Sequence, residues 1–88
     1  MIEVGYTHEF VRVYKKLPDT FKQEVKERIA LFKNRANHQS LRVHKLHGKY
    51  REYWSFSINY RYRILFQYLG KKRDSVVLHT VGDHSIYD

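Results

Sequence analysis

The 88-residue sequence contains no cysteine, one proline and four glycines. Without cysteine there is no disulfide framework and no thiolate-ligated zinc site. No segment approaches the roughly 18 consecutive apolar residues of a membrane-spanning helix. The N-terminal MIEVGYTHEF is interrupted by acids and a histidine, unlike a secretory signal peptide. These absences, together with the lack of repeats and linkers, predict one soluble cytoplasmic domain over residues 1–88, with no membrane contact.

Acidic residues are also scarce. Nine Asp and Glu oppose 17 Lys and Arg, giving a net charge of +8 with histidine neutral and a pI near 9.8. This excess favours a polyanionic partner, because each cation placed near a phosphate releases condensed counterions. In residues 41–63, LRVHKLHGKYREYWSFSINYRYR, six Lys and Arg accompany one acid, with five Tyr and Trp among them. Such interleaving suits phosphate binding and base stacking; a merely soluble cationic surface, with half of the aromatics in the core, is the alternative.

The N-terminal 32 residues predict a strand followed by a helical hairpin. Residues 2–6 alternate apolar and polar side chains, as in a half-buried strand. Thr7 offers an N-cap for a first helix. Pro18 ends that helix or begins the next, in which Thr20 and Gln23 have capping-box spacing. Spacings of three and four mark the two apolar faces, which comprise Phe10, Val13, Tyr14 and Leu17, and then Phe21, Val25, Ile29 and Phe32.

From about residue 40 the apolar period changes to two. Strands are predicted over 52–58, 61–69 and 75–82, with turns at Asn59–Tyr60 and at GKKRD. The element order β-α-α-β-β-β predicts an α+β fold. Because two small helices can cover only one sheet face, the alternate residues of the strands are expected on a solvent-facing, cationic side. These residues are Ser55, Ser57, Arg61 and Arg63.

The element order and four local stretches resemble the RelE/ParE superfamily of toxins from bacterial toxin–antitoxin pairs. The stretches are FVRVYKKLPDTFKQEVKERIALF, LRVHKLHGKYREYWSFSI, YRILF and VGDHSIYD, and together they span nearly the whole chain. The resemblance implies a small twisted antiparallel sheet with a two-helix hairpin packed on one face. It also implies a cognate antitoxin, which the charge predicts to be acidic or amphipathic, in a heteromeric complex or beside a toxin homodimer.

Two activities occur among the proteins that this sequence resembles. RelE-like members cut mRNA on translating ribosomes without a metal or other cofactor, whereas ParE-like members inhibit DNA gyrase without cutting RNA. ParE-like chains do not need a closing His and Tyr, so the ending VGDHSIYD favours the endoribonuclease. An inactive relative that binds only an antitoxin or nucleic acid is a third alternative.

Metal-independent RNA cleavage requires a base for the 2′-hydroxyl, an acid for the leaving 5′-oxygen and cations on the phosphate. Histidine serves either proton role, and arginine directs two donors at a phosphate. The resemblance assigns the acid to His84 and the base to His44 or the nearby His47. It assigns the phosphate to Arg63. Tyr87 would stack the substrate base or assist proton transfer, or else pack on the sheet.

The other basic residues of the central segment are candidates for binding RNA phosphates: Arg42, Lys45, Lys49, Arg51 and Arg61. A solvated charged loop is the alternative for them, and an ion pair with Glu52 or Asp83 is the alternative for Arg63. On the strand aligned with YWSFSI, RelE-like toxins carry Lys, Arg or His. This sequence has Trp54, Ser55, Phe56 and Ser57 instead, so activity would depend on His44, His84 and the arginines. The spacing HKLH, without cysteine or paired carboxylates, does not predict a metal site.

Overall fold

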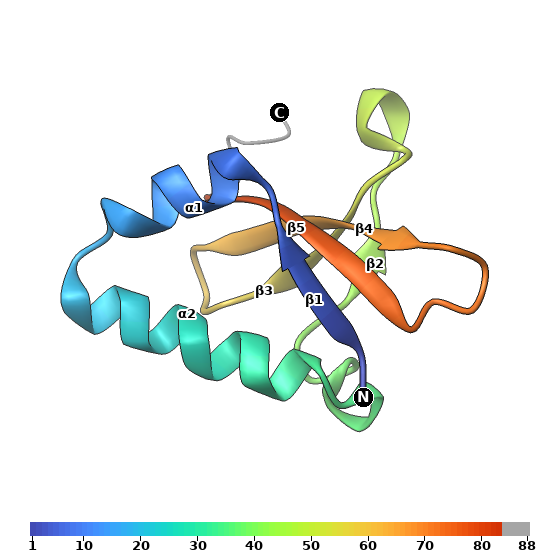
Figure 1. Cartoon of the computed structure of the whole chain (residues 1–88), viewed down its shortest axis with the longest axis horizontal. Helices are drawn as coiled ribbons and strands as arrows, with labels where there is room; N and C mark the ends of the chain where they lie inside the picture. The colour runs from blue at the N-terminus through green and yellow to red at the C-terminus, as the bar shows by residue number, and fades with distance from the viewer. Residues whose placement is uncertain (84–88) are drawn as a thin grey trace.

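The computed structural model describes residues 1–83, which form two α-helices and a five-stranded sheet (Figure 1). In chain order the elements are β1 (Glu3–Tyr6), α1 (His8–Lys15), α2 (Asp19–Phe32), β2 (His44–Lys45), β3 (Trp54–Ser57), β4 (Arg63–Leu69) and β5 (Ser75–Gly82). Two single 3₁₀ turns, η1 (Arg35–Asn37) and η2 (Gly48–Tyr50), flank β2. No helix within residues 1–83 is long and apolar enough to cross a membrane.

The sheet has the strand order β1-β5-β4-β3-β2. The three pairings among β2, β3, β4 and β5 are antiparallel, as short connections between successive strands require. The β1 strand lies parallel to β5. Parallel pairing is possible here because a long connection, and not a hairpin, joins the two strands. The predicted α+β fold and element order are therefore confirmed, but the sheet, expected to be antiparallel, is mixed because β1 pairs in parallel with β5. The two-residue β2 is an additional edge strand.

The two helices begin differently from each other. The Thr7 hydroxyl accepts a hydrogen bond from the Phe10 N–H at 3.0 Å, as predicted, and donates one to the His79 carbonyl at 2.9 Å. The N-cap of α2 is Pro18, with φ of −59° and no side-chain cap. The predicted capping box of Thr20 and Gln23 is wrong, because α2 already begins at Asp19 and Thr20 lies inside its first turn.

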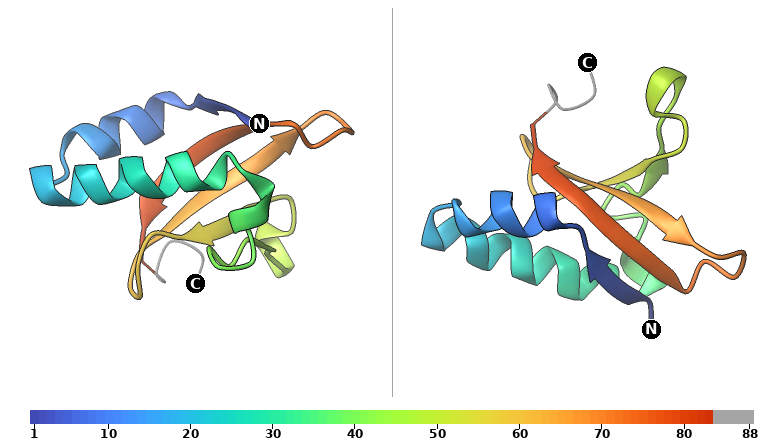
Figure 2. Two further views of the ribbon diagram at one scale, coloured as in Figure 1. Left: turned by 90° about the horizontal axis from the view of Figure 1, so that it is seen from below. Right: turned by 45° about the horizontal axis from the view of Figure 1, so that its top comes forward.

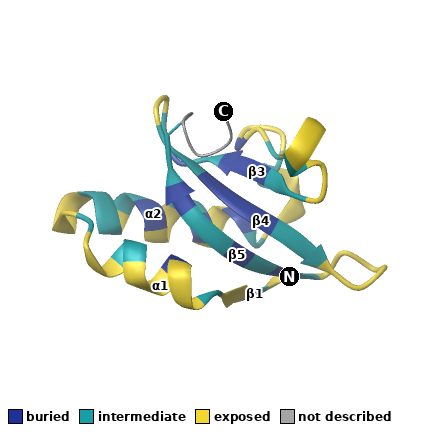
Figure 3. Ribbon diagram, turned by 90° about the horizontal axis from the view of Figure 1, so that it is seen from above, coloured by how far each residue is buried: buried dark blue, intermediate teal, exposed yellow. Residues whose placement is uncertain are grey.

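The core lies between the helices and one face of the sheet. Phe32 of α2 is fully buried, with its ring centroid 4.3 Å from that of Phe56 and 5.0 Å from that of Phe66. Alternate residues of β3 and β4 supply the other side of the core together with Val76, Leu78 and Val81 of β5. The predicted period of two is confirmed in β3 and β4 and is interrupted in β5, where the pairing with β4 shifts by one residue between Leu78 and Thr80. Buried positions lie mainly in the central strands and on one side of α2 (Figure 3), and Ile2, Leu41, Leu46 and Ile58 are buried outside these elements.

Both helices lie on the same side of the sheet (Figure 2). We call the other side the open face; it carries Ser55, Ser57, Arg63, Leu65 and Gln67, which alternate with core residues. Ser55 was expected to face solvent but is fully buried, and Leu65 is only 6% exposed. Ser55 is small and pairs with larger residues on both neighbouring strands, which shield it in the pleat. The accessible polar part of this face is therefore interrupted by Ser55 and Leu65, with Ser57 and Arg63 at one end and Gln67 at the other.

Candidate active site

The strand register brings His44 and Arg63 to the same face of the sheet. Residues directly opposite one another in antiparallel strands point to the same side. The two adjacent rows on the open face are His44–Ser55–Leu65 and Ser57–Arg63–Gly82. With strands about 4.8 Å apart and residues about 3.4 Å apart, the Cα atoms of His44 and Arg63 are separated by about 12 Å.

The Arg63 guanidinium has one engaged nitrogen. Its Nη1 donates to the carbonyl oxygens of Asn59 at 3.0 Å, Tyr60 at 3.3 Å and Tyr62 at 3.1 Å. These contacts hold the turn between β3 and β4. Within residues 1–83, Nε and Nη2 of Arg63 make no hydrogen bond, and the alternative ion pair with Glu52 or Asp83 is not formed. Arg63 therefore keeps two directed donors for an anion while its position is fixed by the turn.

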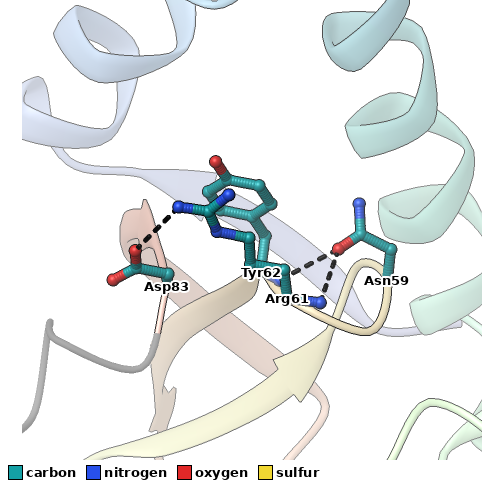
Figure 4. A network of polar contacts seen from close by, with 4 residues as sticks. All are labelled: Asn59, Arg61, Tyr62 and Asp83. Carbon is teal, nitrogen blue, oxygen red and sulfur yellow. Dashed lines mark hydrogen bonds and ion pairs between the residues drawn. The ribbon is translucent and has the colours of Figure 1, made fainter.

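Arg61 is placed on the same turn (Figure 4). The Asn59 Oδ1 atom accepts hydrogen bonds from the backbone N–H groups of Arg61 and Tyr62, both at 2.9 Å. The Arg61 guanidinium lies 5.4 Å from the centroid of the Tyr62 ring, and its Nη2 is 3.9 Å from Asp83 Oδ2. The ion pair with Asp83 is thus made by Arg61. Since its side chain is 69% exposed, the pair is a weak one that an incoming phosphate can replace.

His44 and His47 differ in their hydrogen bonds. The Nδ1 atom of His44 lies 2.8 Å from the carbonyl oxygen of Arg42. A carbonyl only accepts, so in the neutral ring Nδ1 carries the proton and Nε2 carries the lone pair. His47 is exposed and precedes η2 without capping it through its side chain. Of the two histidines, His44 is therefore the one whose hydrogen bond leaves Nε2 with a lone pair that can accept a proton.

The remaining basic candidates do not all join this group. Lys45 is the register partner of Trp54, whose side chain packs on the core, so Lys45 lies on the side of the sheet away from Arg63. Lys49 and Arg51 are exposed on the loop between β2 and β3, which projects from the sheet in Figure 1. Arg42 is exposed next to His44 and has a φ of 57°, in the left-handed region. The structure therefore places His44 and Arg63 on one face of the sheet and Lys45 on the other, with Arg61 on the β3–β4 turn beside Asp83.

His84 and Tyr87 lie outside the described residues. The last residue of β5, Gly82, is the register partner of Arg63, and Asp83 follows it. Among residues 1–83, no group of three or more His, Asp or Glu side chains has the arrangement of a metal site.

One further histidine lies on the open face. The Nε2 of His79 is 2.7 Å from Gln67 Oε1, and its ring packs edge-on against Tyr53 with centroids 5.1 Å apart. Burial lowers the pKa of His79, and the charge of Glu9 opposes that effect. Sequence reasoning did not single out this residue, although its alternation with the buried Val76 and Leu78 was a sufficient signal for its face.

A cleft of about 390 Å³ lies beside Arg63, between α2, the loop before β2 and the β3–β4 turn. We call it the arginine cleft, because Arg28, Arg42 and Arg63 line it. Sequence reasoning missed Arg28. The available signal was a charged residue within an apolar helix stripe, three residues after Val25 and four before Phe32.

Comparison with known proteins identifies the family. Residues 23–88 match the sequence model of the ParE-like toxin domain. No curated protein matches the sequence. Among solved structures, YafQ from E. coli strain BL21(DE3) superposes with a TM-score of 0.72 at 12% identity and full coverage of both chains. The RelBE2 toxin–antitoxin complex of Mycobacterium tuberculosis gives 0.70 at 20% identity, covering 94% of this chain and 98% of that one.

The E. coli DinJ–YafQ toxin–antitoxin complex gives a TM-score of 0.71 at 14% identity, covering 98% of this chain and 96% of that one. At such identities these structures establish a shared fold, and the family match covers three quarters of the sequence, from residue 23 to residue 88. The chain therefore belongs to the ParE-like toxin domain family, and it shares its fold with these toxin structures.

Proposed function

We propose that this toxin is a metal-independent, ribosome-dependent mRNA endoribonuclease that blocks translation. The observation that carries the proposal is the placement of His44 and Arg63 on one sheet face. The lone pair on His44 Nε2 can accept the proton of a 2′-hydroxyl. The Nε and Nη2 donors of Arg63 can bind the neighbouring phosphate.

In the proposed reaction, Arg63 binds the scissile phosphate and Arg61 adds a second cation. His44 Nε2 removes the proton of the 2′-hydroxyl, and that oxygen attacks phosphorus to form a 2′,3′-cyclic phosphate. The bond from phosphorus to the 5′-oxygen breaks, and His84 gives its proton to the leaving oxygen. The support for His84 is its position in the sequence, two residues after Gly82, which is the register partner of Arg63. Tyr87 would stack the substrate base or assist this proton transfer.

The other basic residues would contact the ribosome and the message. In this proposal Arg42, Lys45, Lys49 and Arg51 bind backbone phosphates over a wide surface, and His47 is the alternative base. The site of action is the cytoplasm, where translating ribosomes are found.

A cognate antitoxin would hold the toxin inactive. Support comes from the toxin–antitoxin complexes among the similar structures and from the net charge of +8, which favours an acidic or amphipathic partner. A basic protein encoded next to this toxin would contradict that expectation.

Inhibition of DNA gyrase is the second candidate function. It is favoured by the description of the matching family as ParE-like. It is also favoured by β3, where Ser55 is buried and Ser57 provides no charge on the open face.

The two candidates are separated by induced expression with two measurements. Primer extension on translated messages is compared for the wild type, His84→Gln and the control His8→Gln, which changes an exposed histidine at the start of α1. Plasmid supercoiling is measured in the same cells. We expect cleavage by the wild type and by His8→Gln, and its loss in His84→Gln. Undiminished cleavage in His84→Gln would remove that residue from the mechanism, and intact messages with altered supercoiling would indicate gyrase.

A further inference from the structure

The arginine cleft is strongly cationic. Besides Arg28, Arg42 and Arg63, its lining includes Ser57, Asn59 and Tyr60. None of the residues lining it within 1–83 is acidic. Guanidinium groups gathered at one opening repel one another unless an anion lies between them. The composition of the cleft therefore favours a bound anion.

Arg28 supplies a buried donor that lacks an acceptor. It comes from the side of α2 that carries Val25 and Phe32, both fully buried. Its Nε is inaccessible to solvent and makes no hydrogen bond to any described residue. Glu24, one helical turn earlier, instead accepts a hydrogen bond from Asn59 Nδ2 at 2.9 Å. A buried N–H without an acceptor is unfavourable. Arg28 also lines the cleft, so a rotation of its side chain toward the opening would let a ligand oxygen accept from this N–H.

Arg42 is held at the cleft by contacts on both sides of its backbone. The Ser57 N–H donates to the Leu41 carbonyl at 2.8 Å, and His44 Nδ1 donates to the Arg42 carbonyl at 2.8 Å. Arg42 nevertheless has a φ of 57°, which a residue other than glycine rarely adopts. Such conformations persist where the surrounding structure enforces them, commonly at functional sites. The same loop thus positions both Arg42 and the proposed base His44.

Tyr60 places an aromatic ring beside these charges. The residue is 96% exposed on the β3–β4 turn, and its carbonyl accepts a hydrogen bond from Arg63 Nη1 at 3.3 Å. An exposed ring next to a cationic groove is the arrangement on which single-stranded nucleic acids stack a base.

We propose that the arginine cleft binds the RNA backbone phosphate adjacent to the scissile one, and that Tyr60 stacks the base of that nucleotide. The inference rests on the proposed nuclease function, because Arg63 borders both the cleft and the open face and would lie between the two phosphates. An RNA strand fits the site better than an acidic peptide does, since a carboxylate side chain would leave the Tyr60 ring without a partner.

The test measures binding without cleavage. A short single-stranded oligonucleotide with 2′-deoxy sugars cannot be cut at the 2′ position, and its affinity is measured by fluorescence anisotropy over a series of salt concentrations. We expect Arg28→Gln and Arg42→Gln each to weaken binding about tenfold, as for loss of a charged hydrogen bond. Each should also reduce the slope of log affinity against log salt by about 0.7. Tyr60→Ala should weaken binding at least about fivefold, and Tyr60→Phe should restore it.

The matched control is Arg12→Gln, which removes the same charge from an exposed position on α1. Arg42 is exposed, so its variant keeps the test decisive if Arg28→Gln lowers stability. Equal affinities and salt slopes for Arg28→Gln, Arg42→Gln and Arg12→Gln would overturn the proposal. Binding of a polyglutamate peptide with the same dependence on Arg28, and without an effect of Tyr60→Ala, would assign the cleft to an acidic protein and also overturn it. If the wild type leaves translated messages intact but the oligonucleotide results hold, the nuclease proposal fails and the cleft binds single-stranded nucleic acid without a neighbouring scissile phosphate, which overturns that part of the cleft proposal.

Discussion

Replacement of Arg63 by lysine separates the structural role of this residue from its proposed chemical role. The Nη1 atom holds three carbonyl oxygens of the β3–β4 turn, while Nε and Nη2 are directed elsewhere. A lysine retains the positive charge but has one nitrogen. It can bind the turn or the phosphate, but it cannot do both with fixed geometry.

The magnitudes of the two losses differ. A hydrogen bond from a charged donor contributes about 1.5–3 kcal/mol. The three carbonyls share one nitrogen at a partly exposed position, so their contributions do not add in full. We therefore expect Arg63→Lys to lower the unfolding free energy by about 1–3 kcal/mol. A domain of this size has about 4–13 kcal/mol of stability, so most molecules stay folded. Loss of a directed donor to the transition state costs about 10²–10³-fold in rate. Cleavage should therefore fall far more than the folded fraction does.

The assay pairs urea unfolding with a single-turnover cleavage rate on programmed ribosomes. The control is Val76→Ala, a buried change on the helix side of β5 that should lower stability by about 2 kcal/mol through lost methyl groups and a small cavity. We expect Val76→Ala to cleave at a rate close to that of the wild type. If Arg63→Lys and Val76→Ala have equal stability and equal cleavage rates, the phosphate role of Arg63 is refuted.

Three other predictions test the remaining parts of the structure. His44→Gln should reduce cleavage by about 10²–10⁴-fold and at least tenfold more than His47→Gln, measured by primer extension; a larger effect at His47 would reassign the base. Phe32→Ala should lower the unfolding free energy by about 3–5 kcal/mol in urea titrations, because the ring packs against Phe56 and Phe66; a change below about 1 kcal/mol would contradict this packing. Burial lowers the pKa of His79 in the folded protein below 6.5. The unfolded state therefore binds a proton on this residue at higher pH than the folded state does. Because the unfolded state binds more protons, the unfolding free energy should fall as the pH drops through 6.5. His79→Gln should reduce that fall, and an identical pH profile of unfolding would exclude this origin.

Much of the fold follows from local periodicity. The apolar spacing of three and four before residue 33 and of two after residue 52 identifies the helices and the strands β3, β4 and β5. Periodicity also fixes the face on which Arg63 lies, because its neighbours Tyr62 and Ile64 pack on the core. Periodicity does not fix where α2 begins, because Asp19 and Thr20 are both common near helix N-termini. In the structure Pro18 is the N-cap and the helix begins at Asp19.

The candidate site required more than periodicity. The β2 strand has two residues, too few for a recognisable pattern, so the position of His44 opposite Ser55 depends on the pairing with β3. The choice of His44 over His47 depends on a hydrogen bond to the Arg42 carbonyl. The assignments of His84 and Tyr87 remain predictions from the sequence.

By itself, the sequence determined the two amphipathic helices and the alternating strands, because these patterns depend on residues close together in the chain. It also determined the cationic character and the set of histidines and arginines, which are properties of the composition. Only the tertiary structure decided the parallel pairing of β1 with β5, the burial of Ser55 and the meeting of Arg28, Arg42 and Arg63 around one cleft. These features join segments far apart in the chain, and their geometry is set by strand register and by the packing of α2 on the sheet, which no short stretch of sequence encodes.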